Sequence, residues 1–155
     1  MLQLKDEYST NPKRVVEYAE QLTKGVAGSE LIDKNMDQPI FSTETLDEMV
    51  IKWKTYFDTI EGGPNRAPKF PLPNNYVFLM RYAALGHHSY IDNQVKLTLN
   101  KMAFGGIYDQ IGGGFTRYST DAFWKVPHFE KMLYDNGQLI SLYSEAYTRY
   151  RDPLY

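Results

Sequence analysis

Ionisable and aromatic side chains gather in one stretch of the sequence, from Gly105 to Asn136. Histidine and carboxylate side chains are common general acids and bases, and long ordered loops inside compact domains are often functional. We therefore place the candidate site for a polar or anionic ligand in this stretch. Its ionisable, amide and aromatic members include Asp109, Arg117, Tyr118, Asp121, Trp124, His128, Glu130, Lys131, Tyr134, Asp135 and Asn136.

Three of these side chains are predicted to share one face of a helix. The spacing of apolar residues favours a long helix from Pro127 to about Tyr150, and at 100° per residue His128, Lys131 and Asp135 fall on the same side of it. His128 and Lys131 would then place cations in a first helical turn, where the helix dipole disfavours them. Because locally unfavourable choices are typical of functional sites, we expect the three to converge with Arg117 or Asp121 in a pocket.

Structural explanations of the same residues remain open. Glu130, Lys131 and Asp135 could form a solvated helix face, and His128 could make a purely structural hydrogen bond. The glycine run Gly112–Gly114 lacks the Lys-Ser/Thr of a phosphate-binding loop. With three histidines in the chain and no matching carboxylate spacing, we expect neither a metal site nor a cofactor.

Composition excludes several classes of protein. The chain has 155 residues, no cysteine and a formal net charge of -2. It therefore has no disulfide, thiolate metal site or cysteine nucleophile, and no basic footprint for a nucleic acid. No apolar run approaches the roughly 18 residues of a membrane span, and the N-terminus has no signal-peptide core. We expect a cytoplasmic protein that binds neither nucleic acids nor membranes.

The elements that must position the candidate site are predicted to be helices, which gives an all-α fold. Ser42 or Thr43 is expected to cap the second helix, and the segment from Glu61 to Pro64 to stop it. Long Gly/Pro-rich loops join the helices, with a short hairpin at residues 115–118. The five predicted helices cover residues 12–27, 43–60, 74–85, 90–104 and 127–150, and residues 29–38 are predicted to form a loop.

A four-residue pattern occurs twice in the sequence. Both copies read as any residue, proline, a basic residue and phenylalanine, and each follows a helix and a Gly-Gly loop. Repeated helix–loop–helix units of this kind suggest stacked α-hairpins, as in α-solenoids and α/α toroids. The two copies are Ala67-Pro68-Lys69-Phe70 and Val126-Pro127-His128-Phe129.

Two longer strings resemble a known family. GGIYDQIGGGFTRYSTDAFWKVPHFEKMLYDNGQL is similar to the signature of thioredoxin-domain-containing proteins of the YyaL type, also called spermatogenesis-associated-like proteins, and NRAPKFPLPNN is similar to their other marked segment. The likeness covers about residues 46–155. It implies a thioredoxin-like domain followed by a six-hairpin (α/α)6 toroid related to N-acylglucosamine 2-epimerases and six-hairpin glycosidases.

The chain departs from that plan, because the thioredoxin-like domain with its cysteine motif and most of the toroid have no counterpart in it. We therefore expect a fragment. Residues 1–42 are predicted to be a linker helix and loop, and residues 43–155 to form roughly two α-hairpins of an incomplete toroid. Truncation would leave apolar helix faces uncovered, so we also expect self-association.

By this resemblance the chain is expected to be part of a carbohydrate-active domain, epimerase-like or glycosidase-like, and inactive as a fragment. An epimerase needs an acid and a base, and a glycosidase needs two carboxylates about 5 to 9.5 Å apart. The alternative is a non-catalytic binding or scaffold module. Expected partners are a sugar-like molecule and the thioredoxin-like domain of the full-length chain. The catalytic candidates are His128, Asp135, Glu130 and Asp121, and the substrate-binding candidates are Lys69, Arg117, Tyr118, Trp124, Lys131 and Asn136.

Overall fold

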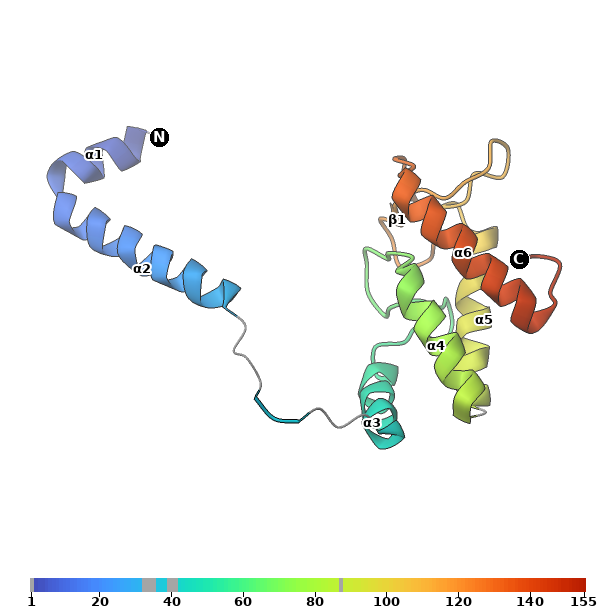
Figure 1. Cartoon of the computed structure of the whole chain (residues 1–155). Helices are drawn as coiled ribbons and strands as arrows, with labels where there is room; N and C mark the ends of the chain where they lie inside the picture. Colours follow the sequence, from blue (N-terminus) through green and yellow to red (C-terminus); the bar gives the residue numbers. More distant parts are fainter. Residues whose placement is uncertain (1, 32–35, 39–41, 87) are drawn as a thin grey trace. The chain divides into compact units, whose positions relative to one another are not determined.

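The computed structural model describes residues 2–31, 36–38, 42–86 and 88–155. It confirms the all-α fold, because these residues form six helices and a single two-stranded sheet (Figure 1). No helix within the described ranges is both long and apolar enough to cross a membrane. The chain divides into two compact units, residues 1–41 and 42–155, and each is described by itself.

The first unit contains helices α1 (Leu2–Thr10) and α2 (Pro12–Glu30). α2 starts at Pro12 as predicted, but its predicted end was wrong, because it continues through Gly25 and Gly28. An isolated glycine inside a helix costs only about 1 kcal/mol relative to alanine, so two of them do not have to stop it. The predicted loop therefore starts later than expected, and its residues 32–35 lie outside the described residues.

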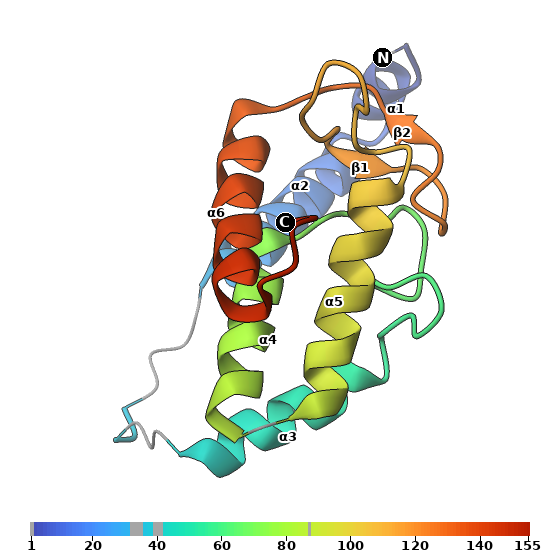
Figure 2. The same ribbon diagram turned by 90° about the vertical axis from the view of Figure 1, so that its right-hand side faces the viewer.

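The second unit is built around four helices. The predicted cap of α3 is confirmed, because the Ser42 hydroxyl oxygen accepts a hydrogen bond of 3.2 Å from the Thr45 N–H. α4 lies beside both α5 and α6, and α3 crosses the end where α4 stops and α5 begins (Figure 2). Leu79, Leu99 and Leu142 of α4, α5 and α6 are fully buried in the shared core. The helices are α3 (Thr43–Lys54), α4 (Pro73–Gly86), α5 (Ser89–Phe104) and α6 (Leu133–Tyr150).

Two predicted helix boundaries in this unit were wrong. α3 ends at Lys54, well before the glycine pair, because the chain turns back on itself and Asp58 N–H donates to the Gly63 carbonyl oxygen at 3.0 Å. α6 begins at Leu133 and not at Pro127. Phe129 supported the longer helix by its apolar spacing, but this residue is 84% exposed.

The residues before α6 form a strand. β2 (Pro127–His128) pairs antiparallel with β1 (Tyr118–Ser119), so the hairpin predicted at residues 115–118 was wrong: its range contains only Tyr118 of this pair. Because His128 and Lys131 both precede α6, the predicted helix face shared with Asp135 was wrong.

The two copies of the repeated pattern meet at β1. On one side of this strand Lys69 exchanges two backbone hydrogen bonds with Ser119, of 2.9 and 2.8 Å, and on the other side Pro127 is the partner of Ser119. The rings of Phe70 and His128 both pack against Tyr118, each with 4.6 Å between ring centroids. β1 therefore contacts two segments that are far apart in the sequence and holds them side by side.

A glycine pair allows the loop after α3 to approach the core. Gly62 and Gly63 have φ angles of +68° and +74°, which favour glycine. A Cβ atom on Gly63 would lie 2.5 Å from Cζ2 of Trp124, and one on Gly62 would lie 2.7 Å from the Thr98 Cα. The indole N–H of the buried Trp124 donates to the Glu61 carbonyl oxygen at 2.9 Å, so this turn and the 105–132 loop are packed together.

Candidate functional site

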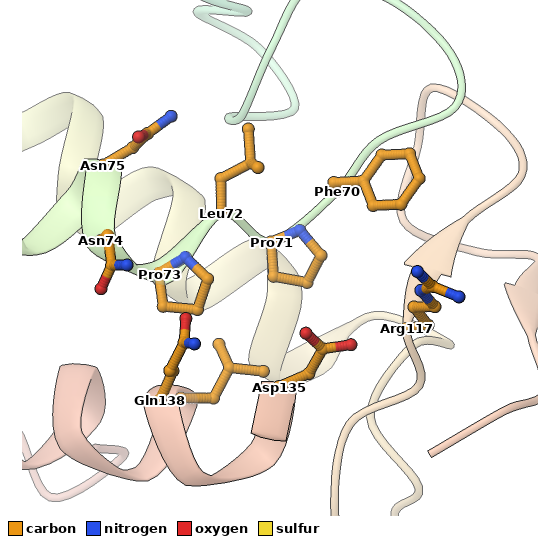
Figure 3. Close-up of a pocket in the computed structure, with 10 residues that line it drawn as sticks. Phe70, Pro71, Leu72, Pro73, Asn74, Asn75, Arg117, Asp135 and Gln138 are labelled. Carbon is orange, nitrogen blue, oxygen red and sulfur yellow. The ribbon is translucent and has the colours of Figure 1, made fainter. Parts of the chain in front are cut away.

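A cavity of about 240 Å³ lies between the proline-rich segment before α4 and the first turns of α6 (Figure 3). Figure 3 shows Asp135 and Gln138 extending from α6 toward that segment, with Arg117 beside them. Leu72, on the opposite wall, has a φ angle of +44°, a strained conformation of the kind that concentrates at functional sites. The cavity is lined by Phe70, Pro71, Leu72, Pro73, Asn74, Asn75, Arg117, Asp135, Gln138 and Leu139.

Asp135 has an unused hydrogen-bond acceptor at this cavity. It lies in the first turn of α6, where the helix dipole favours a negative charge. Its Oδ2 atom is buried and has no hydrogen-bond partner. Within the described ranges, the only other buried side-chain atom of this kind is Nδ1 of His128. Because buried polar atoms are nearly always hydrogen-bonded, this unpartnered oxygen singles out Asp135, which lines the cavity, as a candidate ligand-binding residue.

Arg117 brings a positive charge to the same cavity. Its backbone N–H donates to the Glu130 carbonyl oxygen at 2.8 Å, which holds the residue next to the strand pair. Its Nη1 atom lies 3.8 Å from Oε2 of Glu130. No ion pair within 4 Å joins Arg117 to Asp135 in the described part of the chain, so the two opposite charges face the cavity separately.

His128 and Tyr118 continue this group away from the cavity. Nδ1 of His128 lies 3.8 Å from the same Oε2 atom of Glu130, and the imidazole stacks on Tyr118. Tyr118 in turn packs against Phe70, which lines the cavity. The structure therefore brings together five of the predicted site residues: Arg117, Tyr118, His128, Glu130 and Asp135.

Two predicted substrate-binding residues are completely buried. The Lys69 ammonium group donates hydrogen bonds of 2.7 Å to Oδ2 of Asp58 and 2.7 Å to the Gly62 carbonyl oxygen. Lys69 and Trp124 are both 0% exposed. Neither side chain presents a surface to a ligand, because both are used to pack the loops onto the helices.

The other three predicted residues hold the long loop in shape. Asp121 accepts hydrogen bonds from the Ser119 hydroxyl and from the backbone N–H groups of residues 123, 125 and 126. Lys131 donates to Oδ2 of Asp109 at 2.6 Å and to the Gly113 carbonyl oxygen at 2.8 Å. The Asn136 amide accepts from and donates to the backbone of Phe115, at 2.7 and 2.9 Å.

The same bonds make two carboxyl groups poor general acids. Hydrogen bonds from Lys131 and from the backbone N–H groups of Gly112 and Ile111 hold the pKa of Asp109 well below its usual value. Burial raises the pKa of Asp121, but the hydrogen bonds of its four donors outweigh burial and leave that pKa lowered. A general acid needs a raised pKa, so Asp109 and Asp121 are not suited to that role.

A larger cavity, of about 370 Å³, lies between the end of α5 and α6. Its walls are mainly apolar and aromatic, with Phe115 and Tyr143 among them, and no charged side chain lines it. Its one asparagine, Asn136, already has its amide bonded to Phe115. This cavity offers much less for recognition of a polar ligand than the one beside Asp135.

Three polar residues of the smaller cavity lie outside the set predicted from the sequence: Asn74, Asn75 and Gln138, which line it with side-chain amides. Asn74 and Asn75 end the string NRAPKFPLPNN, which was recognised as a marked segment, although only Lys69 from that neighbourhood was chosen. Gln138 follows Asp135 by three residues and shares its face of α6. A helix start at Leu133 would have identified it.

The fold and the site define a helical protein with a small polar cavity at the start of one helix. Over its whole length the chain is 37% identical to spermatogenesis-associated protein 20 of Homo sapiens and 35% identical to that of Mus musculus. Over 67% of its length it is 43% identical to an uncharacterized protein of Caenorhabditis elegans. The chain is thus a relative of spermatogenesis-associated protein 20, which fits the spermatogenesis-associated-like family that its two marked strings resemble.

The chain spans only a fifth or less of the curated relatives that it matches, 20%, 20% and 15% of these three proteins. No protein-family model matches it.

Proposed function

We propose that the cavity beside Asp135 binds a sugar-like small molecule, as part of a carbohydrate-active (α/α)6 protein of the epimerase or glycosidase type. The observation that carries this proposal is the buried, unpartnered Oδ2 atom of Asp135 at a cavity that Arg117 also lines. The remaining length of the longer relatives would supply the other hairpins and a thioredoxin-like domain.

The chemistry of the cavity wall fits a polyhydroxylated ligand. Sugar hydroxyls both donate and accept hydrogen bonds, and so do the side-chain amides of Asn74, Asn75 and Gln138. A carboxylate such as Asp135 accepts from hydroxyls without needing a positively charged partner. Phe70 adds an aromatic ring, which can pack against the apolar face of a sugar ring. The volume is below the roughly 300 Å³ at which pockets for larger ligands begin, which favours a small ligand.

A second candidate function is binding without catalysis, in a module that works beside a thioredoxin-like domain. One observation favours it: Asp135 is the only carboxylate that lines the cavity within the described ranges. Hydrolysis of a glycosidic bond needs two carboxylates that flank the bond. Glu130 does not line the cavity, and its carboxylate lies 3.8 Å from Arg117 and 3.8 Å from His128.

Replacement of Asp135 by alanine tests the proposed site. Binding of a panel of mono- and disaccharides is measured by calorimetry and ligand-observed NMR. We expect at least tenfold weaker binding by Asp135→Ala, because the variant removes a charged acceptor worth about 1.5–3 kcal/mol. Its stability should change by less than about 1 kcal/mol, because Oδ2 has no partner to lose.

Glu48→Ala is the matched control, since it removes an exposed carboxylate from α3, away from the cavity. If the wild-type chain binds no member of the panel, or if both variants bind as the wild type does, the cavity is not a sugar site. Product formation from a bound sugar, measured with a full-length relative, separates the enzymatic candidate from the binding module.

A further inference from the structure

We infer that the ligand of this cavity is an acidic sugar, whose ring carries a carboxylate, and that Arg117 recognises that carboxylate. The inference rests on the proposed sugar site and adds the chemical class of its ligand. It follows from the different ligand groups that the two charged side chains at the cavity, Arg117 and Asp135, can bind.

The guanidinium group of Arg117 has no hydrogen-bond acceptor among the described residues. Its contact with Glu130, at 3.8 Å between Nη1 and Oε2, is longer than a hydrogen bond. A guanidinium presents its N–H donors in a planar fork that matches the two oxygens of a carboxylate. The hydroxyl groups of a neutral sugar would accept hydrogen bonds from these N–H donors one oxygen at a time, and they would bring no negative charge to the guanidinium.

Asp135 is less selective for the chemical class of the ligand, because any hydroxyl group can donate a hydrogen bond to its carboxylate. An amino sugar would also satisfy Asp135, but it would bring an ammonium group into a cavity that Arg117 lines. A neutral sugar would leave the guanidinium of Arg117 with the 3.8 Å contact to Glu130 and no acceptor within hydrogen-bond distance among the residues that the structure describes. An acidic sugar meets both demands, with its carboxylate at Arg117 and its hydroxyls at Asp135 and Gln138.

The existing neighbours of Arg117 leave room for this pairing. Asp135 forms no ion pair with the guanidinium within 4 Å, so the N–H donors of Arg117 are not occupied by this carboxylate. The Glu130 side chain is 56% exposed, and solvent weakens ion pairs of such exposed groups. A bound carboxylate can therefore compete with Glu130 for Arg117.

The test compares glucuronate, glucose, glucosamine and acetate as ligands of the 155-residue chain at low ionic strength. Charge-assisted bidentate hydrogen bonds are roughly twice as strong as neutral ones. We therefore expect glucuronate to bind on the order of five- to tenfold more tightly than glucose, and glucosamine and acetate to bind more weakly than glucuronate.

Three variants assign the preference to Arg117. Arg117→Met should lower glucuronate binding to the level of glucose, and Arg117→Lys should keep part of the preference. Arg66→Met, which removes an exposed arginine outside the cavity, should leave the preference intact. The Arg117 side chain is 44% exposed, so these variants are expected to fold, which circular dichroism checks.

Glu130→Gln provides an independent test, because it removes the carboxylate that competes with the ligand for Arg117. It should tighten glucuronate binding relative to glucose binding, and weaker glucuronate binding would contradict the inference. Equal affinities of the wild type for glucuronate and glucose overturn the acidic-sugar inference and leave the sugar site standing. Acetate binding as tight as that of glucuronate also overturns it. Failure of all three sugars to bind overturns both proposals.

Discussion

Lys69 and Asp58 form an ion pair whose lysine is entirely shielded from solvent. The Lys69 ammonium lies 2.7 Å from Oδ2 of Asp58, and the Asp58 side chain is only 16% exposed. Burial raises the pKa of Asp58, but hydrogen bonds from the N–H groups of Glu61 and Ile60 and from Lys69 more than offset it. The pKa of Asp58 is therefore lower in the folded chain than in the unfolded one.

Asp58→Asn is expected to lower the free energy of unfolding by roughly 1–3 kcal/mol at neutral pH, because the buried ammonium loses its counter-ion. Since the folded pKa of Asp58 is depressed, the stabilisation is fully present above the unfolded value of about 4 and is lost as the pH falls through the folded value. The difference between wild type and variant should therefore narrow toward pH 3. Urea unfolding at several pH values measures it.

Glu48→Gln serves as the control in that experiment, because Glu48 is an exposed carboxylate in the same unit. It should follow the wild type at every pH. A stability difference for Asp58→Asn that stays constant from pH 7 to acid would show that the ion pair does not set the acid sensitivity of this unit.

At the scale of elements, the turn after α3 and the 105–132 loop depend on each other through Gly63 and Trp124. Gly63→Ala is expected to cost about 2 kcal/mol or more, because the added methyl group meets the Trp124 ring and the φ angle is strained for alanine. Gly137→Ala is expected to stabilise by about 0.5–1 kcal/mol, since this glycine lies inside α6 with open space around it. Thermal unfolding of both variants measures the contrast, and a neutral Gly63→Ala would contradict the packing described for this turn.

The elements that the sequence predicted best are those in which local pattern and burial agree. α4 and α5 lie within one residue of their predicted ranges, because apolar residues such as Leu79 and Leu99 recur at helical spacing and are buried. α6 was predicted six residues too long, because Phe129 follows the same spacing but faces solvent. Spacing alone cannot separate an apolar residue in the core from an exposed one.

For the candidate site, the sequence indicated the stretch from Gly105 to Asn136 but not the role of each residue in it. Arg117 and Asp135 line the cavity as predicted candidates, whereas Lys69 and Trp124 became part of the interior. The difference depends on strand pairing with Ser119 and on a carboxylate at Asp58, both set by contacts between segments distant in the sequence. Such contacts leave no mark in residue spacing.

At the scale of the whole chain, large apolar residues are exposed on all four helices of the second unit, including Ile51 of α3, which is 63% exposed. Leu85 of α4, Phe104 of α5 and Ile140 of α6 are 75%, 74% and 68% exposed. Exposed apolar surface of this kind favours association, so we expect the chain to self-associate at micromolar concentrations through α3–α6. Sedimentation velocity should show a species heavier than the monomer, and Ile140→Glu should reduce it without loss of helix content. A single monomeric species for the wild type would contradict the expectation.

Because Trp124 is buried, its fluorescence depends on whether the 105–132 loop is packed against the rest of the unit. The chain has two tryptophans, and the indole of Trp124 is fully shielded and bonded to the carbonyl oxygen of Glu61, while Trp53 is partly exposed. Detachment of the 105–132 loop from the glycine turn would expose this indole to water and move its fluorescence to longer wavelength. Emission from a chain in which Trp53 is replaced by phenylalanine would therefore follow the docking of the loop that carries Arg117, separately from the melting of the helices.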